Sequence, residues 1–282
     1  VRPSGNRSVG GCFKCADRST GVRLAYVEQC HLGGLPIVML HGLSDSHRSF
    51  DLMRPLLPHA WRVFCLTQRG HGLSAKPESG YAMRDFAADV AAFLDCKRIE
   101  RAVIVGHSMS SAVALQMAAL YPERVAGMVL VGAFARFHGT STMKQLQKAV
   151  ADISGDCGGE FALAFQESTL ANMIPQTFLD TAVNETLRMP GHAWRGVVQG
   201  LIDFDPCGAA RHCRAPAAII WGDRDAYCPR TDQRDLRSAL PSTRFFALPG
   251  VGHAVHWERP AEAASLVSAF VAELDAAALA AE

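Results

Sequence analysis

The sequence has no long hydrophobic run. The longest apolar stretches, such as residues 102–105 and 127–135, fall far short of the roughly 18–20 residues that a membrane-spanning helix needs. Residues 1–11 are polar and rich in Gly and Ser, without the apolar core of a secretion signal. We therefore expect a cytoplasmic protein that does not cross a membrane.

An excess of charge of one sign is also missing. The 282 residues include 28 Lys and Arg against 27 Asp and Glu, which leaves a formal net charge of +1. A surface that binds nucleic acid usually shows a clear basic excess, so no nucleic-acid partner is expected. Because hydrophobic residues make up 49% of the chain and charged residues 20%, a disordered chain is excluded as well.

Cysteine is too scarce for a disulfide-dense scaffold. The nine cysteines are about 3% of the residues, whereas such scaffolds are short and exceed roughly 8–10%. Cys12-x-x-Cys15 has suggestive spacing, but no second pair at zinc spacing accompanies it. We expect reduced cysteines, with Cys65 and Cys96 as small core side chains, and no metal or cofactor.

What the sequence does contain is an alternation of strand and helix patterns. Several strand-like runs are continuously apolar, which is typical of strands buried on both faces of a parallel sheet. The expected strands are 23–29, 36–40, 62–67, 102–106, 127–132, 217–221 and 244–248. Helical patterns between them cover 85–95, 108–121, 231–240 and 260–274. The predicted fold class is α/β, with a doubly wound, mostly parallel sheet.

One long segment interrupts the alternation. Residues 135–210 hold no convincing strand but show four helical patterns, at 142–153, 160–171, 175–187 and 191–201. Parallel sheets bind ligands beyond the carboxyl ends of their strands, so we expect this insertion to be a helical cap. The predicted organisation is a flexible segment over 1–20, a core over 21–134 and 211–282, and a cap over 135–210.

The strongest chemical signal is Gly106-His107-Ser108-Met109-Ser110, which follows an apolar run and opens a helix. A serine at such a sharp turn presents its hydroxyl above the sheet, and small neighbours let strand and helix pass closely. Ser110 stands where the usual G-x-S-x-G motif has its second glycine. The alternative is that Ser108 is an ordinary helix N-cap.

A serine hydroxyl becomes a strong nucleophile only when a base takes its proton and an acid orients that base. Downstream, one strand pattern ends at Asp223 and Asp225, and another is followed by His253. The chain order is then Ser, Asp, His. An alternative use of His253 is as a metal ligand together with His256 and Glu258.

With the His41-Gly42 turn and the Gln68–Ser74 segment, these motifs resemble the α/β-hydrolase fold superfamily over residues 20–275. The resemblance implies Ser108 as nucleophile, His253 as base and, by family spacing, Asp225 rather than Asp223 as acid. It also implies that the N–H groups of Leu43 and Met109 form the oxyanion hole. Ser110 is shared with a subgroup that resembles plant hormone receptors and a bacterial stress-signalling hydrolase. Thr67 stands where many relatives carry Asp.

The expected function is a serine hydrolase that cleaves a carboxylic ester or lactone of a small molecule through an acyl-enzyme, as a monomer or homodimer. Large apolar residues of the cap and its approach are candidates for the substrate pocket, and we select Phe134 and Trp194, with His107 beside the nucleophile. Two alternatives stay open. The first is a carbon–carbon bond or enol-lactone hydrolase of a catabolic pathway, and the second is a hydrolase-like ligand sensor.

Overall fold

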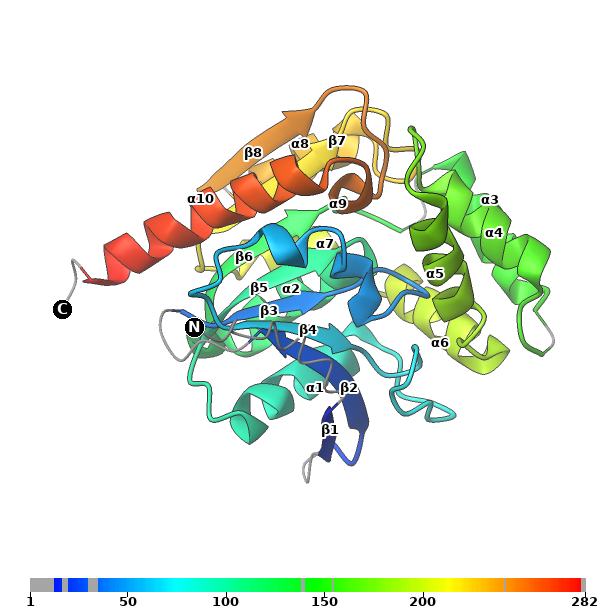
Figure 1. Ribbon diagram of the computed structural model, residues 1–282, viewed down its shortest axis with the longest axis horizontal. Coiled ribbons are helices and arrows are strands. Elements are labelled where there is room, and N and C mark those ends of the chain that lie inside the picture. The colour runs from blue at the N-terminus through cyan, green and yellow to red at the C-terminus, as the bar shows by residue number, and fades with distance from the viewer. Residues whose placement is uncertain are drawn as a thin grey trace, which may run out of the picture.

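A single eight-stranded sheet organises the chain. The computed structural model describes residues 13–16, 20–29, 35–137, 140–153, 155–240 and 242–279 (Figure 1). The strands are β1 (Phe13–Ala16), β2 (Arg23–Gln29), β3 (Ile37–Leu40), β4 (Val63–Thr67), β5 (Ala102–His107), β6 (Val125–Val131), β7 (Ala217–Gly222) and β8 (Thr243–Leu248). Their order across the sheet is β1-β2-β4-β3-β5-β6-β7-β8. β2 pairs antiparallel with both β1 and β4. Along the rest of the sheet, from β4 through β3 to β8, all neighbouring strands are parallel, which confirms the predicted fold class.

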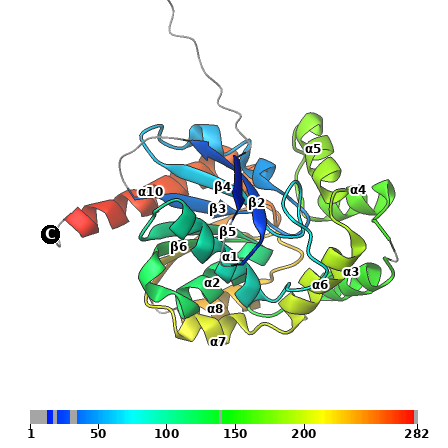
Figure 2. The ribbon, with the colours of Figure 1, turned by 90° about the horizontal axis from the view of Figure 1, so that it is seen from below.

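Helices cover both faces of the sheet. They are α1 (Met83–Cys96), α2 (Met109–Leu120) and α8 (Arg230–Ala239) on one face, and α9 (Val255–Glu258) and α10 (Pro260–Leu279) on the other (Figure 2). Successive strand residues belong alternately to two separate cores. Val38 and Leu40 pack under the first set of helices, and Ile37 and Met39 pack under the second. This double burial explains why the strands read as continuous apolar runs.

The segment between β6 and β7 is helical, as predicted. It contains α3 (Ser141–Ala151), α4 (Gly159–Ser168), α5 (Gln176–Thr186), α6 (Gly191–Ile202) and α7 (Pro206–Arg211). The first four of these helices gather beside the sheet, whereas α7 packs against α2 and α8 (Figures 1 and 2). Asp205 caps the start of α7, and Ala210 within this helix is fully buried. The last helix of this segment, α7, therefore belongs to the helical layer on the sheet.

Two details of the N-terminal half differ from the predictions. Phe13–Ala16, expected within the flexible segment, forms β1 on the sheet edge. Cys65 is a core residue, but Cys96 is exposed and disulfide-bonded, so the prediction of a reduced core cysteine is wrong there. Cys12 lies outside the described residues, and of Cys15 only the backbone is described.

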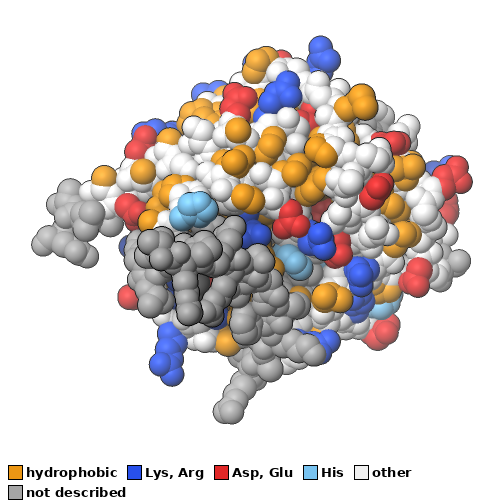
Figure 3. Space-filling view, viewed as in Figure 1, with side chains coloured by type: hydrophobic (Ala, Val, Ile, Leu, Met, Phe, Trp, Pro, Cys, Tyr) orange, Lys and Arg blue, Asp and Glu red, His pale blue; other side chains and the backbone are white. Residues whose placement is uncertain are grey.

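Within the described part of the chain, no helix is both long enough and apolar enough to cross a membrane. On the face drawn in Figure 3, basic and acidic side chains are interspersed rather than gathered by sign. This distribution agrees with the near-zero net charge of the sequence.

Candidate active site

Ser108 occupies a strained turn between β5 and α2. Its φ is 51°, in the left-handed region that residues with a side chain seldom adopt. The turn is so tight that a Cβ on Gly106 would lie 2.2 Å from the carbonyl oxygen of Ser110, and only glycine fits at that position. The Ser108 side chain makes no capping hydrogen bond to α2, so the interpretation as an ordinary N-cap is wrong.

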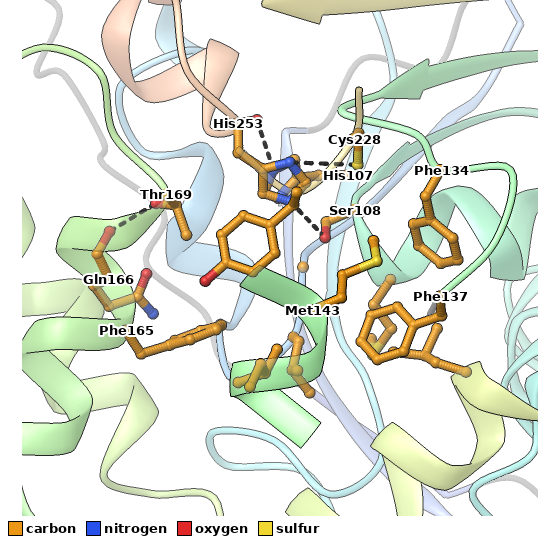
Figure 4. A pocket seen from close by; sticks show the side chains of 16 residues that line it. His107, Ser108, Phe134, Phe137, Met143, Phe165, Gln166, Thr169, Cys228 and His253 are labelled. Carbon is orange, nitrogen blue, oxygen red and sulfur yellow. Dashed lines mark hydrogen bonds between the residues drawn. The ribbon is translucent and has the colours of Figure 1, made fainter. Parts of the chain in front are cut away.

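A chain of hydrogen bonds runs from Ser108 through His253 to Asp225. Ser108 Oγ lies 2.7 Å from His253 Nε2 (Figure 4). On the other side of the ring, His253 Nδ1 lies 2.8 Å from Asp225 Oδ2. The other oxygen of Asp225 accepts hydrogen bonds from the backbone N–H groups of Tyr227 at 2.8 Å and Cys228 at 2.9 Å. These donors fix the carboxylate, which in turn holds the imidazole with Nε2 facing the serine.

The competing residues have structural partners instead. Asp223 accepts a hydrogen bond from Gly250 N at 2.6 Å and closes a turn away from His253. His256 Nε2 lies 3.0 Å from Ser49 Oγ, and the Glu258 carboxylate accepts from the backbone of Gly252 and from neighbouring donors. The three residues His253, His256 and Glu258 do not come together as a metal site among the described residues.

The turn after β3 approaches the start of α2. Leu43 and Met109, expected to supply the oxyanion hole, line the same cavity as Ser108. Gly42 is required here because a Cβ would lie 2.7 Å from His107 Nδ1. The His107 ring is buried, and burial together with the neighbouring His256 and His253 lowers its pKa, so it stays neutral beside Ser108.

Ser110 has a specific role in this arrangement. Its buried hydroxyl donates a hydrogen bond to the carbonyl oxygen of His41 and accepts one from Gln68 Nε2 at 2.7 Å. Gln68 N also donates to His41 Nε2 at 3.0 Å. The serine that replaces the second motif glycine therefore ties α2 to the turn that carries Leu43.

Replacing Ser110 with alanine is expected to lower the free energy of unfolding by about 1–3 kcal/mol, because it leaves buried polar groups of His41 and Gln68 short of a partner. Urea denaturation monitored by fluorescence measures this loss. Ser111→Ala is the matched control: its hydroxyl is buried in the same helix without a hydrogen-bond partner among the described residues. That variant should be neutral or slightly stabilising, and equal effects of the two changes would contradict the assigned role of Ser110.

The hydrogen-bonded chain opens into a cavity lined by residues from the sheet and from the helical insertion (Figure 4). Its walls are mainly apolar, and no described residue that lines it is Lys, Arg, Asp or Glu. The apolar lining residues are Leu43, Met109, Phe134, Phe137, Met143, Leu146, Phe165 and Leu201. An apolar lining with a few polar groups is typical of a small-molecule site.

Of the predicted pocket residues, His107 and Phe134 line this cavity and Trp194 does not. Trp194 is fully buried and packs edge-on against Phe161 and Phe165, so it supports the wall from behind. The sequence analysis missed Phe165, whose ring faces the cavity in its place. The helical period of α4 and α6 marks all three aromatic residues as buried but does not say which one reaches the ligand side.

Two polar residues near the end of α4, also missed, connect the helical insertion to the site. Gln166 Nε2 donates to Thr186 Oγ1 at 2.7 Å and to Asp45 Oδ1 at 3.1 Å. Burial raises the pKa of Asp45 to about 7, although its hydrogen bonds from Gln166 and a serine oppose the shift. The carbonyl oxygen of Thr169 accepts hydrogen bonds from His253 N at 2.9 Å and Ala254 N at 3.1 Å.

Comparison with known proteins agrees with this architecture. A family model described as the α/β-hydrolase fold matches residues 36–150. Together with the sheet order and the strand-to-helix serine turn, this match places the chain among proteins of the α/β-hydrolase fold.

Individual relatives point to the same class. The chain is 29% identical over 268 residues to the dihydrolipoyllysine-residue acetyltransferase component of an acetoin cleaving system from Pseudomonas putida, covering 89% of this chain and 67% of that protein. A putative aryl esterase from Burkholderia cenocepacia has a TM-score of 0.83 at 22% identity, over 93% of this chain and 98% of that one. The enol-lactonase from Burkholderia xenovorans LB400 has a TM-score of 0.75 at 20% identity, over 92% and 99%.

Proposed function

We propose that the protein is a serine hydrolase that cleaves a small, uncharged carboxylic ester or lactone through an acyl-enzyme. The observation that carries the proposal is the hydrogen-bonded chain of Ser108, His253 and Asp225 at the mouth of an apolar cavity. Each of these side chains follows a parallel strand at its carboxyl end, where sheets of this kind bind ligands.

The geometry suits acyl transfer. Ser108 attacks the carbonyl carbon while His253 Nε2 takes the hydroxyl proton, and Asp225 stabilises the imidazolium that forms. The backbone N–H groups of Leu43 and Met109 receive the developing oxyanion at the start of α2, a contribution typically worth about 3–4 kcal/mol per donor. His253 then protonates the leaving alcohol, and in the second half it activates the water that releases the acid.

The helices α3, α4 and α6 act in this proposal as a cap over the cavity. Met143 and Leu146 come from α3, Phe165 from α4 and Leu201 from α6, and all four residues line the cavity. Closing an apolar roof over the acyl group excludes bulk water and strengthens the electrostatic interactions beneath it.

Turnover of p-nitrophenyl esters of increasing acyl length, together with a panel of small lactones, tests the proposal. Steady hydrolysis beyond one equivalent supports an enzyme. The dependence of the rate on acyl length shows how long an acyl chain the cavity accepts. A single burst that stops near one equivalent would contradict it and indicate a ligand sensor instead.

The absence of charged lining residues predicts a preference for uncharged substrates. We expect the ester of a simple fatty acid to be hydrolysed with a kcat/KM at least about 100-fold above that of a dicarboxylic half-ester of equal chain length. The reason is that the free carboxylate would be buried without a partner among the described lining residues. Parallel kinetics on the two esters measure the ratio.

A paired set of variants sharpens this measurement. Leu146→Arg places a cation at the cavity wall and should narrow the ratio, whereas Leu146→Met keeps the wall apolar and should leave the ratio unchanged. Equal rates on both esters for the unmodified protein would show that a charge in the cavity is tolerated and that the predicted preference is wrong.

A further inference from the structure

A cysteine lies directly beside the Asp225–His253 pair. Cys228 is fully buried at the end of the loop after β7, and its Sγ lies 3.7 Å from His253 Nδ1 (Figure 4). The same sulfur donates to the carbonyl oxygen of Gly132 at 3.2 Å. The hydrolytic mechanism proposed above makes no use of this thiol.

The three side chains form a compact set of potential metal ligands. One atom each from Asp225, Cys228 and His253 can be chosen so that all lie within 4.8 Å of one another, and all three residues are buried. Among the described residues, this is the group of His, Cys, Asp and Glu whose atoms are close enough to share an ion. A carboxylate and an imidazole alone are a weak zinc site, and the sulfur supplies the third ligand that open zinc sites have.

From this arrangement we propose that Cys228, His253 and Asp225 form an inhibitory site for a thiophilic divalent cation such as Zn²⁺ or Cd²⁺. The inference concerns control of the site and goes beyond the reaction itself. Both Cys228 and His253 line the cavity, so an ion can reach them from the side on which the substrate enters.

The spacing of the ligand atoms suits zinc with a small adjustment. Zinc–sulfur and zinc–nitrogen bonds of about 2.3 and 2.0 Å place tetrahedral ligands roughly 3.5 Å apart. The sulfur and Nδ1 are already at 3.7 Å, and the 2.8 Å contact between Nδ1 and Asp225 must open by roughly half an ångström. Both backbone donors bond Asp225 Oδ1, so a small rotation of the carboxylate about that oxygen moves Oδ2 this far while the two bonds are kept.

The charges and protons of the bound state balance. The thiol of Cys228 gives up its proton to solvent, and the proton on His253 Nδ1 moves to Nε2 as the ion takes its place. A thiolate and a carboxylate then neutralise the two positive charges, so the buried site carries no net charge. Burial and the nearby Asp225 raise the pKa of the Cys228 thiol well above its ordinary value, so without an ion it stays protonated.

Inhibition follows from the tautomer of the histidine. With the ion on Nδ1, the proton sits on Nε2, which then donates toward Ser108 and cannot take its proton. The ion also removes Asp225 from its place as the partner of Nδ1–H. The same ion therefore blocks both the base and the residue that orients it.

Titration of the purified protein with Cd²⁺ tests the inference. We expect hydrolysis of a p-nitrophenyl ester to stop as one ion binds per chain, with growth of the ultraviolet thiolate-to-cadmium absorbance band and full recovery on addition of a chelator. In Cys228→Ser the half-inhibiting concentration should rise at least about 100-fold, and the band should disappear. Mg²⁺ should neither inhibit hydrolysis nor produce the absorbance band, because it prefers oxygen ligands.

The control variant is Cys207→Ser, which removes a free and partly buried thiol in α7. It should keep both the sensitivity to Cd²⁺ and the band of the unmodified protein. If Cys228→Ser is inhibited as strongly as the unmodified protein, or if the band remains, the site is elsewhere and the inference is wrong.

The absorbance band separates this test from that of the proposed function. It reports ligation by Cys228 even if no ester in the panel is hydrolysed. In that case, loss of Ser108 labelling by a fluorophosphonate in the presence of Cd²⁺ replaces the activity assay. Labelling that is insensitive to Cd²⁺ would overturn the proposed inhibition.

Discussion

Ser108→Ala is expected to lower ester hydrolysis by at least about 10³-fold. Alanine keeps the backbone of the turn between β5 and α2 but removes the atom that forms the acyl-enzyme. The residual rate would come from the oxyanion donors and substrate binding alone. Initial rates on the best ester of the panel measure the loss.

Two observations accompany that rate. Ser111→Ala, which deletes a buried hydroxyl one turn from the site, should keep full activity and so controls for damage to α2. Mass spectrometry of the fluorophosphonate-treated protein should place the adduct on Ser108. A Ser108→Ala variant that retains more than about a tenth of the activity would rule out acyl transfer to this serine.

The second large effect is expected for Asp225→Asn, with a fall in kcat of roughly 10³–10⁴-fold and a small change in KM. The amide has nearly the same shape as the carboxylate, but it can donate to His253 Nδ1 and then favours the wrong tautomer of the imidazole. It also cannot stabilise the imidazolium. Steady-state kinetics at fixed pH separate kcat from KM.

Asp223→Asn is the matched comparison, two residues away in the same loop. Asp223 bonds only the Gly250 turn in the described structure, so its replacement should leave kcat within a few-fold of the unmodified protein. If Asp223→Asn were the more damaging change, the assignment of the acid would be reversed.

The sheet was predictable because its strands bury both faces. The apolar runs at 37–40 and 102–107 stand out in the sequence for the same reason that they form the two cores. The strand at 13–16 was missed because it is short and carries a lysine, as edge strands often do. The helix at 206–211 was assigned to the cap because its packing partners, α2 and α8, are remote in sequence.

The hydrogen-bonded chain was predictable for a different reason. Ser108, Asp225 and His253 each follow a strand pattern, and the carboxyl ends of parallel strands meet at one edge of the sheet. The residues of the cavity wall could not be predicted in this way, because Trp194 and Phe165 are distinguished only by how α4 and α6 are rotated against each other. Cys228 was not noticed either, since a single cysteine has no sequence pattern that reveals a neighbour 25 residues away.

The carbonyl oxygen of Thr169 holds the backbone of His253 and Ala254 to the end of α4. In hydrogen-exchange terms, we expect these two amides to exchange with the cooperative unit of the helical insertion rather than with that of the sheet. An excursion that lifts the end of α4 would free both amides at once and remove one anchor of His253, the proposed general base. In the proposed enzyme, admission of a substrate and assembly of the base are thus coupled, and water that enters an open cavity would meet a histidine that is not yet in position.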